Sequence, residues 1–315
     1  MTRLLAALLL SLVPFSPAFS HDSDRTDDLL KAVRKARLID LSHTWDKSSP
    51  IASVNPLYSF ALSATHANTR GTFGDGDPGQ LSFTSEVMSW SGQHGAPSID
   101  AIGHIGRDGK LFGGVDAAAS TSNPDGIGTS GVGAHLAIDR FPNDLLINRG
   151  ILLDVATMVQ GNSSPLPADF EITAAHLEQA ARRQKVKLKK GDTVFIRTGW
   201  GPLFKSDPAA YAGAFSPGPG LNAAEYLIKQ GARVVGNDTL TFEKRPPIVL
   251  EPKFQVFPVH MRLIADKGVY IIENLDLEGL ARAKAYEFAV VVPPIKVLGG
   301  TGSAVRVFAL VPHDD

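Results

Sequence analysis

The strongest constraint on the fold is an alternation of apolar runs with amphipathic segments in the second half of the chain. Two amphipathic helices are predicted, one starting after Thr173 and one over 222–230 that ends at Gly231. Strands are predicted over 150–159, 193–198, 232–235, 269–272, 288–292 and 304–311. Strands that alternate with helices are typical of an α/β domain with a mixed sheet.

Two other segments differ from this pattern. Residues 21–37 are polar and charged, which predicts a leading helix or tail outside the domain. Residues 59–79 are rich in Gly, Thr, Asp and Ala, which predicts a long loop or hairpin rather than core. We therefore predict one α/β domain over 38–315, with 21–37 as an N-terminal extension.

The first twenty residues have the features of a cleavable signal peptide. Arg3 follows the start methionine, Leu4–Val13 is almost wholly apolar, and small residues stand at Ala18 and Ser20. The apolar run is too short to span a bilayer, which needs about 20 residues. The pattern predicts a periplasmic or secreted protein.

If this prediction is right, N-terminal sequencing of periplasmic material from the native host should start between His21 and Asp24. Cleavage is expected there because the small residues occupy the positions that signal peptidase recognises. Recovery of the chain from the cytoplasm with Met1 intact would contradict it.

Charge and cysteine content narrow the function. The formal net charge is −1, so neither nucleic acid nor an anionic membrane is a predicted partner. The chain has no cysteine, which excludes disulfides, thiolate nucleophiles and cysteine metal ligands. Any metal ion must therefore be held by imidazole and oxygen ligands.

A polar segment at 94–104 carries the first candidate ligands. A glycine and a proline within it argue against a helix, so the backbone is predicted to be extended or looped. Side chains at every second residue of an extended chain share a face, and the polar ones here are His94, Ser98, Asp100 and His104. Two imidazoles and a carboxylate on one face suit a divalent cation. The alternative is a polar loop with scattered histidines.

A second cluster lies later in the chain. Glu273 interrupts an otherwise apolar predicted strand, shortly after His260. A buried carboxylate without a partner costs several kcal/mol, and a nearby metal ion or histidine would offset that cost. The alternative is a glutamate at the strand end that points into solvent or caps a neighbour.

Taken together, the residues resemble the metal-dependent cyclase/amidohydrolase family that includes bacterial kynurenine formamidase and isatin hydrolase. The resemblance runs from about Ile39 to Pro312. It rests on the order and spacing of several short segments, namely Ile39–His43, Leu152–Val155, Ile196–Trp200, Ser216–Gly218, Gly236–Asp238, His260 with Glu273–Leu275, and Gly300–Ser303 before Arg306.

The resemblance implies a single domain with a mixed, partly barrel-like sheet flanked by helices, of the swivelling β/β/α type. The family's signature is His, three residues, His, one residue, Asp, three residues, His. By this resemblance His94 and Asp100 are metal ligands and His104 is the acid/base. His260 and Glu273 fall where the family places a second-site histidine and an acidic or amide residue.

The chain departs from the signature at Ser98, which stands where the second ligand imidazole is expected. Two readings follow. In one, His94, Asp100, His260 and Glu273 hold one divalent ion, Mn²⁺ or Zn²⁺: the oxygen-rich set favours Mn²⁺, whereas the general affinity order favours zinc. In the other, the metal is lost and the chain is a periplasmic binding protein or pseudo-enzyme on the same fold.

The resemblance further implies a hydrolase that acts on non-peptide C–N bonds in a small cyclic or N-acyl amide, of arylformamide or lactam type. Aromatic side chains near the family's opening segment line its pocket, and Trp45 and Phe60 are the candidates here. Family members are usually dimers or tetramers, so a homo-oligomer is expected, with a small molecule as substrate.

Overall fold

The computed structural model describes residues 22–74, 81–93 and 95–312. The chain divides into two compact units, Met1–Ala36 and Arg37–Asp315. The first contains one helix, α1 (Asp22–Lys35), in the stretch predicted as a polar helix or tail. The predicted signal peptide lies outside the described residues. Among the described helices, none has the length and apolar character needed to cross a membrane.

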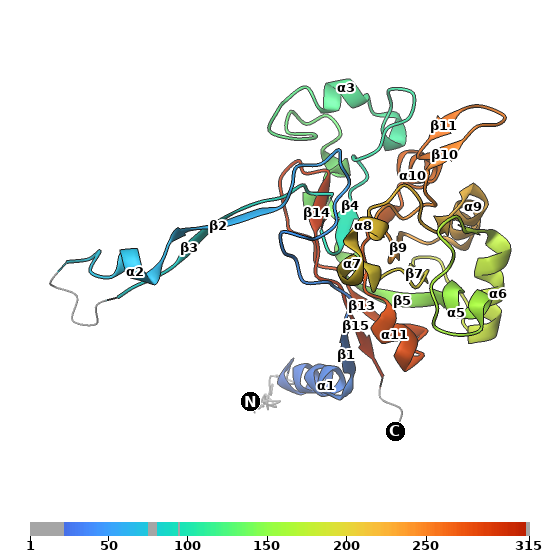
Figure 1. Ribbon diagram of the computed structural model, residues 1–315, viewed down its shortest axis with the longest axis horizontal. Helices are drawn as coiled ribbons and strands as arrows, with labels where there is room; N and C mark the ends of the chain where they lie inside the picture. Colours follow the sequence, from blue (N-terminus) through green and yellow to red (C-terminus); the bar gives the residue numbers. More distant parts are fainter. Residues whose placement is uncertain (1–21, 75–80, 94, 313–315) are drawn as a thin grey trace, which may run out of the picture. The chain divides into compact units, whose positions relative to one another are not determined.

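A nine-stranded mixed sheet organises the second unit (Figure 1), in the order β1-β15-β13-β5-β7-β9-β12-β4-β14. The four strands β5, β7, β9 and β12 run parallel, and every other neighbouring pair is antiparallel. The strands are β1 (Arg37–Asp40), β4 (Ser98–Asp100), β5 (Ile147–Asp154), β7 (Thr193–Arg197), β9 (Val234–Asn237), β12 (Tyr270–Glu273), β13 (Glu287–Val291), β14 (Gly302–Ala304) and β15 (Phe308–Val311). The mixed sheet predicted from the sequence is confirmed.

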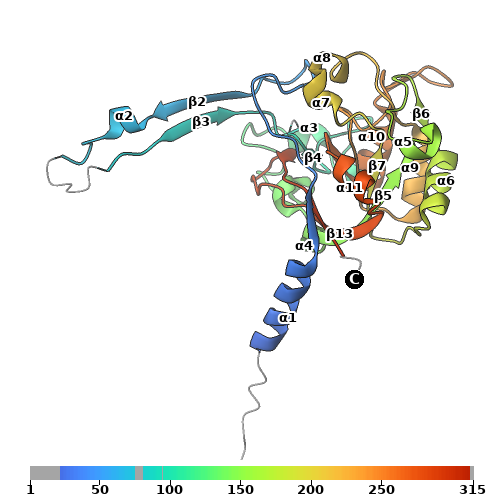
Figure 2. The same cartoon turned by 60° about the horizontal axis from the view of Figure 1, so that its bottom comes forward.

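Helices cover both faces of this sheet (Figures 1 and 2). One face packs against α5 (Val155–Gln160), α6 (Ala174–Gln184), α9 (Leu221–Gln230), α10 (Pro258–His260) and the following π-helical turn η4 (Met261–Ala265). The other face packs against α4 (Asn143–Leu146), α11 (Glu278–Ala283) and the 3₁₀ turns η1 (Phe112–Gly114), η2 (Ala134–Leu136) and η3 (Ile138–Arg140). The remaining helices are α2 (His66–Thr69), α3 (Ala117–Ser120), α7 (Leu203–Ser206) and α8 (Pro208–Tyr211).

The apolar residues of the central strands alternate between the two cores because strand side chains point to opposite faces. Ile151 and Leu153 of β5 pack with the α6 and α9 side, whereas Leu152 between them packs on the opposite side. In β12, Ile271 faces α9 and α10, and Ile272 faces away from them. This alternation fixes which strand residues can meet a side chain from α10.

Two predicted strands differ in extent from the observed elements. The run predicted over 150–159 is a strand only to Asp154, whose carboxylate accepts the backbone N–H of Thr157 and so begins α5. Of the run predicted over 304–311, Ala304 is the last residue of β14, and β15 begins only at Phe308. The cap at Asp154 ends the first strand within an apolar run that composition alone does not divide.

Three two-stranded sheets complete the fold: β2 (Ser59–Ala64) with β3 (Ser85–Ser89), β6 (Glu171–Ile172) with β8 (Gly218–Pro219), and β10 (Ile248–Val249) with β11 (Gln255–Val256). The segment 59–79, predicted as a long loop or hairpin, begins with β2, which pairs with β3 beyond the end of that segment. Nearly all side chains of the two strands are exposed. The predicted homo-oligomer stays a prediction, which light scattering would test.

Candidate metal centre

The candidate site begins on the sheet, where β12 ends beside β4. These strands are antiparallel, and Ile271 pairs with Asp100 while Glu273 pairs with Ser98. Side chains of directly paired residues lie on the same face, so Ser98, Asp100 and Glu273 share the face covered by α9 and α10. Glu273 is the last residue of a parallel strand, and the carboxyl ends of such strands are where α/β folds usually place ligands.

His260 reaches this face from α10. The helix docks through Val259, while Leu263 and Ile264 of the following π-helical turn pack in the same apolar core as Ile271. Phe257, immediately before the helix, has a left-handed backbone (φ 52°), and its ring contacts the His260 imidazole edge to face. The turn and the packing together direct the imidazole toward the end of β12.

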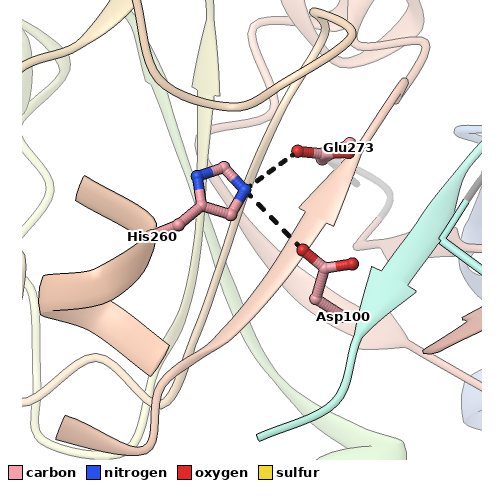
Figure 3. Close-up of side chains that lie close together, drawn as sticks. All are labelled: Asp100, His260 and Glu273. Carbon is pink, nitrogen blue, oxygen red and sulfur yellow. Dashed lines mark hydrogen bonds and ion pairs between the residues drawn. The ribbon is translucent and has the colours of Figure 1, made fainter. Parts of the chain in front are cut away.

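The imidazole of His260 lies between three carboxylates. Its Nε2 is 3.2 Å from Glu273 Oε1 and 3.7 Å from Asp100 Oδ2 (Figure 3). Its Nδ1 is 2.6 Å from Oε1 of Glu243 on the opposite side of the ring. All four residues are at most 6% exposed. The site therefore concentrates negative charge around one imidazole in a dry environment.

This concentration of charge shifts the protonation of the site. Burial acts to lower the pKa of His260, but the hydrogen bonds and charges of Glu243 and Glu273 outweigh burial and raise it well above its ordinary value. Burial raises the pKa of Glu273 to about 7; the hydrogen bond from His260 opposes the rise, and the charge of Asp100 adds to it. An imidazolium thus supplies the positive charge that these carboxylates need.

The donor set fits a divalent cation. Within the described residues, one atom each of Asp100, His260 and Glu273 lie within 4.8 Å of one another. Two carboxylate oxygens and one imidazole nitrogen suit Mn²⁺ or Zn²⁺. A cation would replace the proton on His260 Nε2 as the positive charge of the site. His94, the fourth predicted ligand, lies outside the described residues.

The loop before β4 is fixed to the end of β12. Asn274, whose φ is +60°, donates from Nδ2 to the carbonyl of Gly95 (3.1 Å) and accepts the Tyr211 hydroxyl at Oδ1 (3.0 Å). A Cβ on Gly95 would lie 2.2 Å from the Pro97 carbonyl oxygen and 2.9 Å from the Trp45 ring, so this position needs glycine. The contacts tie the residue after predicted ligand His94 to the residue after Glu273.

His104, the predicted acid/base, follows β4 in a turn closed by its own N–H to the Ala101 carbonyl (3.0 Å). Its Nε2 is 4.0 Å from Oδ1 of Asp100, whose other oxygen faces His260. The His104 side chain is 30% exposed, unlike the buried cluster. It therefore lies at the solvent side of Asp100, where a proton can be exchanged with water.

Ser98 lies beside the cluster and has another partner. It stands directly opposite Glu273, and its hydroxyl donates to the Gln93 carbonyl oxygen at 2.9 Å. The position departs from the family signature, and the structure shows that it shares the face of the two carboxylates. A longer side chain with a nitrogen donor would extend from here toward Glu273.

We therefore expect Ser98→His to raise affinity for Mn²⁺ and Zn²⁺ about fivefold or more, because an added imidazole contributes a further ligand. Titration of the metal-free protein measures it. Ser303→His is a matched control: Ser303 is also buried, but it pairs with Ile99 and so faces the other side of the sheet. Equal affinity in the wild type and Ser98→His would show that residue 98 does not reach the ion.

The two predicted pocket aromatics occupy different places. Trp45 packs edge to face against Tyr58 and Trp90, and the three line a small hollow beside Gly95. Phe60 lies on β2 opposite Met88, is 45% exposed and does not line that hollow.

A larger hollow of about 580 Å³ lies on the same loop and is also lined by Trp45 and by His43, Ala96, Pro97 and Arg306. None of Asp100, His260 and Glu273 lines it. The smaller aromatic hollow has a volume of only about 20 Å³ and is likewise lined by none of these three residues, so neither hollow directly includes the candidate ligands.

Sequence reasoning missed Glu243. It is followed by Lys244, Arg245 and two prolines, which together resemble a solvated turn, and it lies 17 residues before His260 in sequence. Only its burial (2% exposed) and the folding of α10 onto the same face reveal its contact with His260.

The fold places a buried cluster of carboxyl groups and one imidazole at the end of a parallel strand. The profile of the putative cyclase family matches residues 39–244, and the chain belongs to that family. An isatin hydrolase from Roseibium aggregatum is 29% identical over 181 residues, which is 55% of this chain and 65% of that protein.

Solved structures show the same fold. The crystal structure of a novel cyclase aligns with a TM-score of 0.74 and 26% identity, over 91% of this chain and 93% of that one. Isatin hydrolase A from Labrenzia aggregata, bound to benzyl benzoate, aligns with a TM-score of 0.67 and 21% identity over 92% and 100%. The mixed, partly barrel-like sheet that the family resemblance implied is thus that of cyclase-fold proteins.

Proposed function

We propose that this chain is a metal-dependent hydrolase of a small cyclic or N-acyl amide. The observation that carries the proposal is the buried cluster of Asp100, His260 and Glu273, whose ligand atoms lie within 4.8 Å of one another. The similarity to an isatin hydrolase supports hydrolysis as the reaction class. We further propose that the bond it hydrolyses is a C–N bond.

In this proposal Asp100, His260 and Glu273 hold the ion, with His94 as a further candidate. A divalent cation bound there would polarise a carbonyl oxygen and lower the pKa of a nearby water. Burial of the cluster excludes bulk water and strengthens the electrostatic interactions within it. Asp100 connects the two parts of the site, since one of its oxygens faces His260 and the other His104.

His104 is the proposed acid/base. Its side chain is partly exposed, and its Nε2 lies 4.0 Å from Asp100. An imidazole can accept a proton from water and return it to a leaving nitrogen. The carboxylate of Asp100, at 4.0 Å, is close enough to interact with the positive charge that the ring gains during the transfer.

The aromatic side chain of Trp45 suggests a flat substrate. Trp45 lies against Gly95, the residue after predicted ligand His94, and it lines the larger hollow of about 580 Å³, where the flat ring of a substrate can stack on it. Arylformamides and isatin-like lactams have this shape. They are therefore the first compounds to test.

The test is hydrolysis of a panel of arylamides, lactams and lactones by purified protein, before and after removal of metal with a chelator. We expect turnover of at least one aromatic lactam or formamide, its loss after chelation and its return with Mn²⁺ or Zn²⁺. Absence of turnover across the panel with either ion would contradict the proposal.

One observation favours a second candidate, a metal-depleted binding protein on the same fold. Ser98 replaces a ligand histidine of the family signature, and its hydroxyl is already engaged with the Gln93 carbonyl. A protein of this kind would bind aromatic amides without turnover. Calorimetry that detects binding in the absence of metal, with no hydrolysis in its presence, would favour this candidate.

A further inference from the structure

Glu243 contacts the side of His260 that faces away from the proposed ion. Its Oε1 lies 2.6 Å from His260 Nδ1 and accepts the backbone N–H of His260 at 3.0 Å. Its Oε2 accepts the backbone N–H of Val259 at 3.2 Å. Both carboxylate oxygens are thus used, and the side chain is 2% exposed.

The backbone that carries Glu243 is tightly held. Phe242, directly before it, is fully buried with φ of +40°, a conformation that non-glycine residues adopt only when the surroundings impose it. The Asn237 amide donates to the Phe242 carbonyl at 2.7 Å. A Cβ on Gly218 would lie 2.5 Å from the Glu243 backbone, so strand β8, which contains Gly218, passes close to Glu243. Glu243 therefore cannot move away from His260 easily.

The contacts of Glu243 favour a proton on Nδ1 of His260. Both Glu243 oxygens already accept backbone N–H groups, as an ionised carboxylate does, and a carboxylate beside Nδ1 favours the proton on that nitrogen. When Nδ1 is the protonated nitrogen of a neutral imidazole, the lone pair is on Nε2, which points at Asp100 and Glu273.

We propose that Glu243 is the positioning residue of the metal centre: it holds His260 in the Nδ1–H tautomer and aims Nε2 at the ion. This inference rests on the proposed function and adds to it Glu243, which is not one of the proposed ligands. Carboxylates that accept a hydrogen bond from a ligand histidine raise its basicity and fix its ring, and their loss weakens metal binding about 10- to 100-fold.

Glu243 also caps the short helix α10, so a purely structural role must be separated from a role in metal binding. Asp192 provides the matched control, because it too is a buried carboxylate that accepts a backbone N–H, from Lys189, and pairs with a basic side chain, Arg149. Asp192 comes just before the first residue of β7, whereas Glu273 is the last residue of β12. Asp192 therefore lies at the opposite end of the parallel strands.

The experiment compares Zn²⁺ and Mn²⁺ affinity, by competition with a chromophoric chelator, in the wild type, Glu243→Gln and Asp192→Asn, together with the melting temperature of each metal-free protein. We expect Glu243→Gln to weaken affinity about 10- to 100-fold, and Asp192→Asn to leave it within about twofold even if it lowers the melting temperature as much. Unchanged metal affinity in Glu243→Gln, or an equal loss of affinity in both variants, overturns the inference. The proposed function stands in either case as long as the wild type binds the ion.

A wild type that binds neither ion overturns both the inference and the proposed function. If Glu243→Gln does not fold, long-range ¹H–¹⁵N spectra of histidine-labelled wild-type protein with Zn²⁺ decide. The His260 ring should show a proton on Nδ1 and the metal on Nε2. A ring that binds the ion through Nδ1, or carries its proton on Nε2, overturns the inference.

Discussion

Asp100→Ala is expected to lose bound metal and hydrolysis together. Asp100 is a direct candidate ligand whose two oxygens face His260 and His104, so its removal takes away both a donor atom and the link between them. Loss of an outer-shell partner costs a metal site about 10- to 100-fold in affinity, and loss of a direct ligand should exceed that. Inductively coupled plasma analysis and turnover of the same sample measure both effects.

The control for Asp100→Ala is Asp192→Ala, which removes a similarly buried carboxylate at the opposite end of the parallel strands. That variant should keep its metal even if its melting temperature falls. Asp100→Ala protein that retains stoichiometric metal would show that the carboxylate is not a ligand.

His104→Ala is expected to keep its metal and to slow turnover by about 10²–10⁴-fold, the usual contribution of a positioned acid/base. The side chain faces Asp100 at 4.0 Å from the solvent side and lies outside the buried group of candidate ligands. The variant thus separates proton transfer from metal binding, which a loss of activity alone does not. Metal content and kcat of one preparation provide the comparison.

His135→Ala provides the matched control, because His135 is an exposed histidine in the 3₁₀ turn η2 and belongs to no candidate site. Its turnover should equal that of the wild type. If His104→Ala lost its metal as Asp100→Ala is expected to, His104 would be a ligand instead of an acid/base.

The periodicity of apolar residues predicted most strands of the sheet. It failed where a single polar contact determines where a strand ends. The helix after Thr173 begins as predicted, because Thr173 accepts the backbone N–H of His176. The helix before Gly231 ends as predicted, because Gly231 takes the left-handed conformation that ends a helix. The end of β5 at Asp154 could not be predicted, since the apolar run continues through the first turn of α5.

For the site, the sequence indicated residue types but could not indicate their partners. Spacing suggested Asp100, and the interrupted apolar strand suggested Glu273; the fold brings both to His260. Glu243 could not be predicted, because its role depends on the packing of α10 and on a backbone conformation at Phe242 that local sequence does not encode. Whether Phe60 contacts substrate stays a prediction.

The central claim is that Asp100, His260 and Glu273 form a metal centre. The most direct measurement is anomalous diffraction at the manganese or zinc absorption edge from crystals of protein loaded with that ion. We predict one strong anomalous peak in contact with all three side chains, with Glu243 on the far side of the His260 ring. A peak elsewhere, or none despite full loading in solution, would contradict the account.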